Sequence, residues 1–251
     1  DTKMKSFSKK DTNIIKGIAI ICLMIHHCFK SRNRYKNLTV IFSPFTESSV
    51  NYIAAFLKIC VPIFVFLTAY GITISLKKKY QLSNLKYNNI AQYVKHRFFN
   101  LYTGWIFVFL FCEIFGLVYN RLPIDTYGKN IQGVVYFILD GFGIANLFHT
   151  PTLVGTWWYM SLAVTLILVI PLVIKAYEKI GFVYMVLLFS ILSRQLALTE
   201  SSIIHWLPIV FLGIVSADKD LLIKIANYKI IKNSDIVNKI VKCLIGIILI
   251  L

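Results

Sequence analysis

The chain alternates between long apolar blocks and short polar segments that are rich in lysine and arginine. A helix needs about 20 predominantly apolar residues to cross the hydrocarbon core of a bilayer. The blocks of roughly that length predict six membrane-spanning helices, at about 14–29, 52–76, 101–119, 153–174, 182–198 and 203–217. We therefore expect an all-α fold, a polytopic transmembrane helix bundle.

The segments between these blocks predict shorter or irregular structure. Residues 1–13 form a polar lead, and residues 80–100 form a basic connector. Residues 120–153 contain the apolar run VVYFIL, which is too short to cross a membrane and predicts a surface or re-entrant helix. The last apolar run, 240–251, is also shorter than a span. We therefore expect the chain to stop inside a seventh helix, and residues 1–251 to form a single, incomplete membrane domain.

Composition indicates an integral membrane protein and excludes a soluble domain. Hydrophobic residues make up 57% of the chain. The formal net charge of +16 could instead indicate a nucleic-acid-binding protein, but the basic residues lie between the apolar blocks and no nucleic-acid motif is present. The five cysteines have no CxxC spacing and lie in or beside apolar blocks, as small buried hydrophobes do, so we expect no metal site.

The basic residues also predict the orientation in the membrane. With the N-terminus in the cytoplasm, the cytoplasmic segments carry about twice as many lysines and arginines as the outer loops, as the positive-inside rule requires. The basic cluster at 30–36 is the one exception. We expect a multi-pass protein of the cell membrane, with the lipid bilayer as its partner. Lys16 then lies near the cytoplasmic face and His27 near the outer face.

The first apolar block carries the most informative pair of ionisable residues. Lys16 and His27 are eleven residues apart, about 20° more than three turns of an α-helix, so their side chains share one face roughly 16 Å apart, whereas His26 points about 80° away. We interpret His27 as a general base or a nucleophile, and Lys16 as a ligand for the phosphates of a cytoplasmic donor. The alternatives are a histidine satisfied by a loop carbonyl and a lysine that only fixes topology.

Further candidates lie at and inside the third block. Arg97 and Lys95 precede this block on the predicted cytoplasmic side, where they could clamp phosphates or only mark topology. Glu113 lies in the middle of the block, where a carboxylate needs a partner. It could orient a histidine, take a proton, or form a structural ion pair.

Polar and aromatic residues near the predicted outer face could contact an acceptor. These residues are Asp140, Trp157, Trp158 and Arg194. Tryptophan is common at membrane–water interfaces, and charged loop residues are commonly solvated, so interfacial packing and solvation are the alternatives.

Five short motifs, in this order along the chain, resemble the acyltransferase-3 family of membrane O-acyltransferases, within the wider transmembrane acyl-transferase superfamily. They are KGIAIICLMIHH, VPIFVFLTAYG, KHRFFNLYTGW, TWWYMSLAVTLIL and LPIVFLGIV. The first contains the basic residue, ten further residues and histidine that open the family's first helix. The resemblance covers nearly the whole chain in the right order.

This resemblance implies about ten helices and the transfer of an acetyl group from cytoplasmic acetyl-coenzyme A, a co-substrate rather than a permanently bound cofactor. The acceptor it implies is a hydroxyl of a cell-surface glycan or its precursor. His27 matches the family's catalytic histidine, and Lys16 matches its basic partner, which is more usually arginine. Arg97 matches the first of two arginines spaced three apart, but Asn100 stands at the second, and Thr103 replaces the proline that follows.

Two other functions fit the same bundle. A non-enzymatic membrane module would use the scaffold for small-molecule uptake or partner binding. A glycan polymerase or exporter would need wide outer loops that carry arginines, whereas only 120–153 is long here. The motifs favour the acyltransferase, and they indicate neither the identity of the acceptor nor an oligomeric state.

Overall fold

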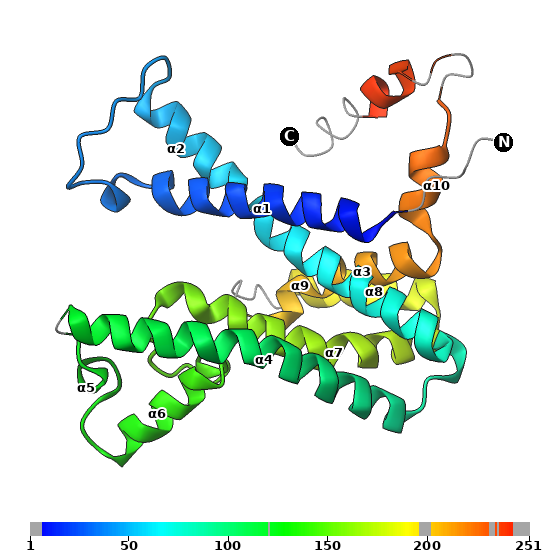
Figure 1. Cartoon of the computed structure of the whole chain (residues 1–251). Coiled ribbons are helices and arrows are strands. Elements are labelled where there is room, and N and C mark those ends of the chain that lie inside the picture. The colour runs from blue at the N-terminus through cyan, green and yellow to red at the C-terminus, as the bar shows by residue number, and fades with distance from the viewer. Residues whose placement is uncertain (1–6, 120, 196–201, 231–233, 235, 243–251) are drawn as a thin grey trace.

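The computed structural model describes residues 7–119, 121–195, 202–230, 234 and 236–242. Every regular element within these residues is helical, which confirms the predicted all-α fold (Figure 1). The helices are α1 (Lys9–Phe29), α2 (Glu47–Phe56), α3 (Cys60–Tyr80), α4 (Tyr87–Val118), α5 (Pro123–Tyr127), α6 (Ile131–Gly141), α7 (Trp158–Ile180), α8 (Phe182–Gln195), α9 (Ile203–Asp218) and α10 (Leu221–Asn227). Residues 236–242 are also helical, and the rest of the predicted seventh span lies outside the described residues.

Four helical runs are long and apolar enough to cross a membrane, which agrees with a multi-pass protein. They are Lys9–Phe29, Glu47–Tyr80, Tyr87–Val118 and Gly155–Ile180. In the second run a single 3-10 turn joins α2 to α3. The last two predicted spans correspond to α8 and α9, which are shorter apolar helices. Of the six complete spans that we predicted, four are therefore confirmed by length and composition.

α4 begins well before the apolar block that predicted it. Residues 87–100, which we expected to form a connector, are helical, so α4 is 32 residues long. The prediction of a connector was therefore wrong for residues 87–100, which contain no proline or glycine to stop a helix, whereas residues 81–86 do connect α3 to α4. Hydropathy located the membrane part of the helix but not its start. The short helix expected within 120–153 is α6, which has 11 residues.

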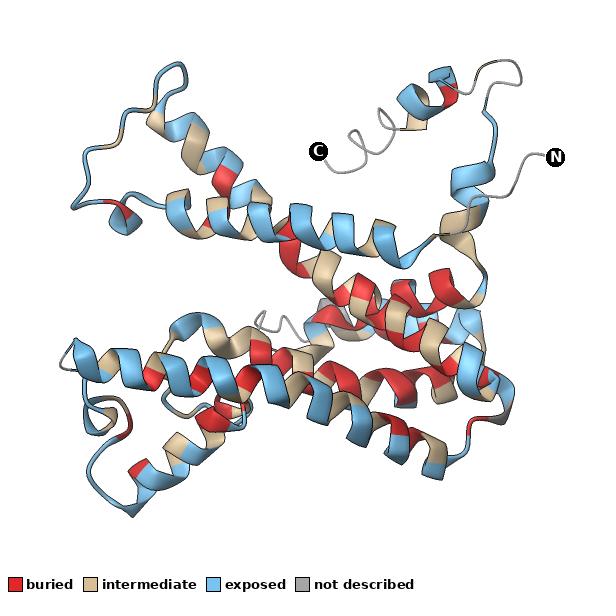
Figure 2. Ribbon diagram, viewed as in Figure 1, coloured by how far each residue is buried: buried red, intermediate tan, exposed pale blue. Residues whose placement is uncertain are grey.

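The core lies where α3, α7 and α9 pack together, and most of the buried residues in Figure 2 belong to these helices. Its fully buried side chains include Val65, Leu76, Leu166, Ile170, Val210 and Ile214. α3 and α9 approach closely at Gly213, where a Cβ atom would lie 2.8 Å from both the carbonyl oxygen of Phe66 and the Cβ of Ala69. α1 and α4 instead expose most of their apolar side chains, as expected of helices that face lipid (Figure 2).

α1 starts at a capping box and packs on α2 and α3. The Oγ of Ser8 accepts a hydrogen bond from the N–H of Asp11 (3.2 Å), and the Asp11 carboxylate accepts one from the N–H of Ser8 (2.8 Å). Ala19 is fully buried against the core. α1 lies apart from α4, whereas α6 lies beside α4 (Figure 1). Lys16 and His27 on α1 therefore lie on a helix apart from α4, which carries Arg97 and Glu113.

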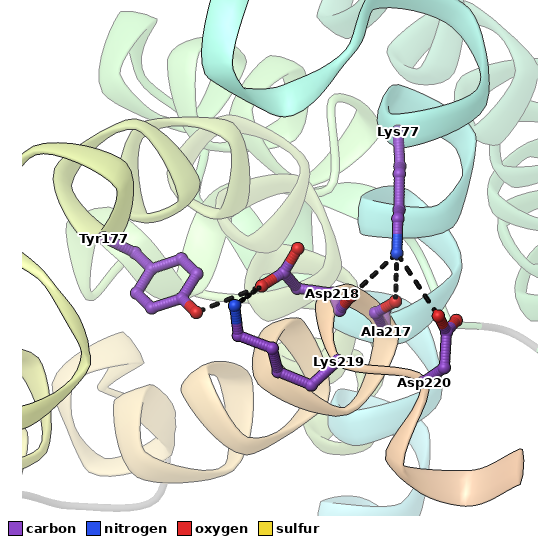
Figure 3. Close-up of polar contacts among 6 residues, drawn as sticks. All are labelled: Lys77, Tyr177, Ala217, Asp218, Lys219 and Asp220. Atoms are coloured by element: carbon purple, nitrogen blue, oxygen red, sulfur yellow. Dashed lines mark hydrogen bonds and ion pairs between the residues drawn. The ribbon is translucent and has the colours of Figure 1, made fainter. Parts of the chain in front are cut away.

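Lys77 of α3 caps the C-terminal end of α9 (Figure 3). Its Nζ donates to the carbonyl oxygens of Asp218 (2.7 Å) and Ala217 (3.4 Å) and lies 3.6 Å from Oδ2 of Asp220. The last carbonyls of an α-helix have no hydrogen-bond donor within the helix, and they form the negative end of its dipole. A cation at this end donates hydrogen bonds to the carbonyls and also interacts favourably with the dipole. The Tyr177 hydroxyl donates to Oδ2 of Asp218 (3.1 Å), which ties α7 to the same turn.

Replacing Lys77 with methionine is expected to lower the free energy of unfolding by about 1–2 kcal/mol, because carbonyls at the end of α9 lose their donor. The side chain of Lys77 is 37% exposed, so water can solvate part of the vacated site and the effect stays at the low end of this range. The measurement is the midpoint of unfolding in mixed detergent micelles. Lys78→Met, at an exposed neighbouring position, is the control, and an equal shift in both variants would contradict this role for Lys77.

Candidate functional site

His26 joins α1 to the end of α2. It is buried, and its Nδ1 lies 2.7 Å from the carbonyl oxygen of Ala54. A carbonyl oxygen only accepts, so Nδ1 of His26 must carry the hydrogen and donate it. His26 is therefore a helix-packing residue whose ring is fixed in orientation.

His27 differs from its neighbour. Its ring meets the His26 ring edge to face, with the centroids 5.3 Å apart and the planes at 75°. Its Nδ1 is buried but has no hydrogen-bond partner in the part of the chain that the structure describes. Buried ring nitrogens are normally paired, so an unpaired one requires an explanation. Among the described residues, His27 thus has no hydrogen-bond partner for this ring nitrogen.

Lys16 lies on an exposed part of α1 and makes no hydrogen bond or ion pair with the described residues. α1 is continuous from Lys9 to Phe29, so the helical spacing that relates Lys16 to His27 applies. Ile20, on the same stripe, is 50% exposed. The stripe from the lysine to the histidine therefore lies along an accessible side of the helix.

Arg97 lies between α4 and α3 rather than beside α1. Its Nε donates to the hydroxyl of Tyr93 (2.9 Å), and its Nη2 donates to Oγ of Ser75 (3.3 Å). Lys95, two residues earlier, is exposed and makes no polar contact with the described residues. Because a guanidinium has five N–H donors, Arg97 is held in place and still has donors for a ligand. The structure does not bring Lys16 and Arg97 into contact, since α1 and α4 diverge (Figure 1).

Glu113 and Asp140 meet at the hydroxyl of Tyr127. The phenolic oxygen lies 2.8 Å from Oε1 of Glu113 and 2.7 Å from Oδ2 of Asp140, and all three residues are buried. Asp140 also accepts hydrogen bonds from the hydroxyl of Thr152 (2.8 Å) and the N–H of Leu153 (2.8 Å). One helix of the membrane domain, α4, is thereby linked to α5, to α6 and to the segment before α7.

Two carboxyl groups share a single phenolic hydrogen in this cluster. The Tyr127 hydroxyl has a single hydrogen, which it can donate fully to only one of the two carboxyl groups. The second carboxyl group makes a full hydrogen bond only when it is protonated, because its own O–H can then donate to the phenolic oxygen. Burial raises the pKa of Asp140, while hydrogen bonds from Leu153, Tyr127 and Thr152 lower it. Burial and the two carboxyl groups also raise the pKa of Tyr127, which therefore remains a donor.

Of the two tryptophans predicted to contact an acceptor, Trp157 lies near this cluster. Trp157 packs edge to face on Trp105, with the ring centroids 4.8 Å apart, and lies 5.8 Å from the ring of Phe109, one turn before Glu113. Trp158 instead packs on Tyr159. The side chain of Arg194 lies outside what the structure describes. The structure thus groups Glu113, Asp140 and Trp157, while the two histidines lie on α1.

Tyr127 is not among the site residues predicted from the sequence. Nothing in the pattern around it indicates a role, because it ends a helix of five residues in a loop region. The sequence indicates only that the carboxyl group of Glu113, in the middle of an apolar block, needs a partner, and it does not identify which residue that partner is.

Comparison with known protein families decides the class of this protein. A family model described as an acyltransferase domain, the acyltransferase-3 type, matches residues 10–250. The chain belongs to the acyltransferase-3 family. No curated protein and no solved structure matches it.

Membership of the acyltransferase-3 family confirms the resemblance drawn from the motifs and implies acyltransferase activity in a membrane protein. The matched range includes all the candidate residues, from Lys16 on α1 to Trp158 on α7 and Arg194 on α8. The roles predicted for these residues remain predictions.

Proposed function

We propose that this acyltransferase moves an acetyl group from acetyl-coenzyme A to a hydroxyl of a cell-surface glycan or its precursor. The observation that carries the proposal is the unpartnered Nδ1 of His27, on the same helix as Lys16, in a chain of the acyltransferase-3 family. A general base needs a ring nitrogen whose lone pair is not already engaged. His26 is instead buried and donates its Nδ1 hydrogen to Ala54 in the contact between α1 and α2, so we assign it a packing role.

The chemistry is acyl transfer from a thioester to an alcohol. His27 takes the proton of the acceptor hydroxyl as that oxygen attacks the thioester carbonyl carbon. The resulting oxyanion requires electrostatic stabilisation, and it collapses with cleavage of the carbon–sulfur bond. The thiolate that leaves takes the proton from the His27 imidazolium. The products are an ester of the acceptor and the free thiol of the coenzyme.

The cations of the domain are proposed to bind the phosphates of the coenzyme. Lys16 and Lys95 are exposed and make no polar contact with the described residues, and Arg97 retains free donors. A guanidinium binds phosphate through two parallel hydrogen bonds, and an ammonium binds it as a point charge. With the N-terminus in the cytoplasm, these residues face the compartment that contains the coenzyme.

The acceptor is proposed to bind on the opposite side of the membrane. Asp140, Trp157, Trp158 and Arg194 are the proposed contacts, with Glu113 as a group that orients or neutralises. The cluster of Glu113, Tyr127 and Asp140 supports this assignment because it holds polar groups at the end of a membrane helix. Aromatic side chains such as that of Trp157 commonly pack on sugar rings through their apolar faces, which suits a glycan.

The test is an acetyl-transfer assay with the purified full-length protein in lipid nanodiscs. Radiolabelled acetyl-coenzyme A is supplied with candidate glycans, and acetyl groups on the glycan are counted. Label is expected on the glycan only when acceptor and enzyme are both present. Tight coenzyme binding with no transfer to any glycan would contradict the proposal and favour the non-enzymatic module.

A further inference from the structure

A groove runs along the C-terminal third of α4 and is not part of the site described above. It has a volume of about 490 Å³, within the range of ligand sites in proteins. The α4 side is formed by Phe111, Phe115 and Tyr119, which are 58%, 51% and 67% exposed. Leu153 and Val154, just before α7, form the opposite wall. The groove is therefore apolar along most of its length.

The opposite wall is held in place by the buried carboxyl cluster. The N–H of Leu153 donates to Oδ2 of Asp140 (2.8 Å), and the hydroxyl of Thr152 donates to Oδ1 of the same carboxyl (2.8 Å). Arg121 folds back on the end of α4, because its N–H donates to the carbonyl oxygen of Gly116 (2.9 Å). The groove thus has two fixed walls and a cation at one end.

The length of the groove suits a hydrocarbon chain that lies parallel to the helix. Phe111 on α4 and Tyr119 at its C-cap are eight residues apart, which is a rise of about 12 Å along the helix. The hydrocarbon part of one leaflet is half of a core that is about 30 Å thick. One wall lies at the end of the apolar run Tyr87–Val118, and the other directly precedes the run Gly155–Ile180, so the groove lies near one end of two helices that are long enough to cross a membrane.

Arg121 gives the groove its selectivity. It is exposed, follows α4 directly after its apolar run, and makes no ion pair with the described residues. An arginine in this position lies at the level of the lipid headgroups and attracts phosphate. A net negative headgroup is favoured over a zwitterionic one, because no acidic side chain described here already neutralises this arginine.

We propose that this groove binds one anionic phospholipid of the surrounding bilayer, with an acyl chain along Phe111 and Phe115 and the phosphate at Arg121. The proposal does not depend on transfer activity. It concerns a lipid that stays with the protein, whether or not His27 catalyses transfer.

The experiment is native mass spectrometry of the full-length protein after reconstitution in equal amounts of phosphatidylglycerol and phosphatidylcholine. The wild type is expected to retain one phosphatidylglycerol in preference to phosphatidylcholine. Arg121→Gln is expected to weaken that preference about fivefold, the effect of one basic residue near a membrane surface. Arg121→Lys keeps the charge and is expected to restore most of it. Lys129→Gln removes an exposed cation that does not line the groove, and it is the matched control.

A second variant tests the apolar lining of the groove. A Cβ at position 116 would lie 3.5 Å from the carbonyl oxygen of Arg121, an ordinary contact, so Gly116→Leu adds bulk to the groove without a clash at its Cβ. It is expected to lower retention of the lipid at least fivefold while Arg121 remains. Equal retention of both lipids by the wild type would overturn the proposal, and so would equal effects of Arg121→Gln and Lys129→Gln. A protein dimer without bound lipid would also overturn it and would indicate that a second copy covers this face.

Discussion

Replacing His27 with alanine is expected to reduce the rate of acetyl transfer by about 10²–10⁴-fold, the usual contribution of a general base. The affinity for acetyl-coenzyme A is expected to stay largely unchanged, because the histidine acts on the reacting bond and not on the phosphates. The measurements are single-turnover transfer of labelled acetyl groups and equilibrium binding of the coenzyme. A variant that loses both to the same extent would assign His27 to coenzyme binding instead.

His26→Ala is the matched control for this prediction. The two histidines are adjacent, so both substitutions disturb the same turn of α1. His26→Ala removes the buried hydrogen bond to the carbonyl of Ala54, at a cost of about 1–3 kcal/mol in the free energy of unfolding. Its transfer rate, normalised to folded protein, is expected to fall only slightly. Equal loss of rate in the two folded variants would falsify the assignment of the base to His27.

Replacing Tyr127 with phenylalanine is expected to lower the free energy of unfolding by about 2–3 kcal/mol. The hydroxyl is the hydrogen-bond partner of Glu113, and its loss leaves two buried carboxyl groups facing a gap. Transfer to the glycan is expected to weaken as well, since the cluster supports the proposed acceptor side. The measurements are the unfolding midpoint in mixed micelles and the KM for the acceptor.

Two further variants make this prediction specific. Tyr136→Phe changes a partly exposed tyrosine of α6 that is hydrogen-bonded to Gln132, and its effect is expected to stay below about 0.5 kcal/mol. Glu113→Gln retains an oxygen that accepts from Tyr127, so it is expected to destabilise less than Tyr127→Phe. Comparable unfolding midpoints for Tyr127→Phe and Tyr136→Phe would show that the buried cluster does not stabilise the domain.

The cluster also predicts a dependence on pH. Burial raises the pKa of Asp140 above its usual value, so over the interval between the two values the folded protein binds more protons than the unfolded one. Stability therefore falls as the pH rises through the raised pKa. Asp140→Asn removes this titration, and its unfolding midpoint is expected to vary less with pH over that interval than the midpoint of the wild type.

The sequence by itself determined the features that depend on local spacing. Apolar blocks located four helices that are long and apolar enough to cross a membrane, since length and hydropathy suffice to identify such helices. The face shared by Lys16 and His27 followed from helical geometry alone, because an α-helix relates residues along one chain segment by a fixed rotation. The ordered motifs predicted the family, and the family model confirmed it.

Only the tertiary structure decided the partners of the polar side chains. His26 meets a carbonyl 28 residues away, and Glu113 meets a tyrosine 14 residues away in a different helix. Such contacts depend on how loops place one helix against another, and the hydrophobic pattern leaves that placement open because it only marks which segments are apolar. The same limit explains the start of α4 at Tyr87, since polar residues without proline or glycine can continue a helix that hydropathy alone does not locate. Local periodicity thus predicted the helices, whereas the packing of distant segments decided which buried polar groups meet.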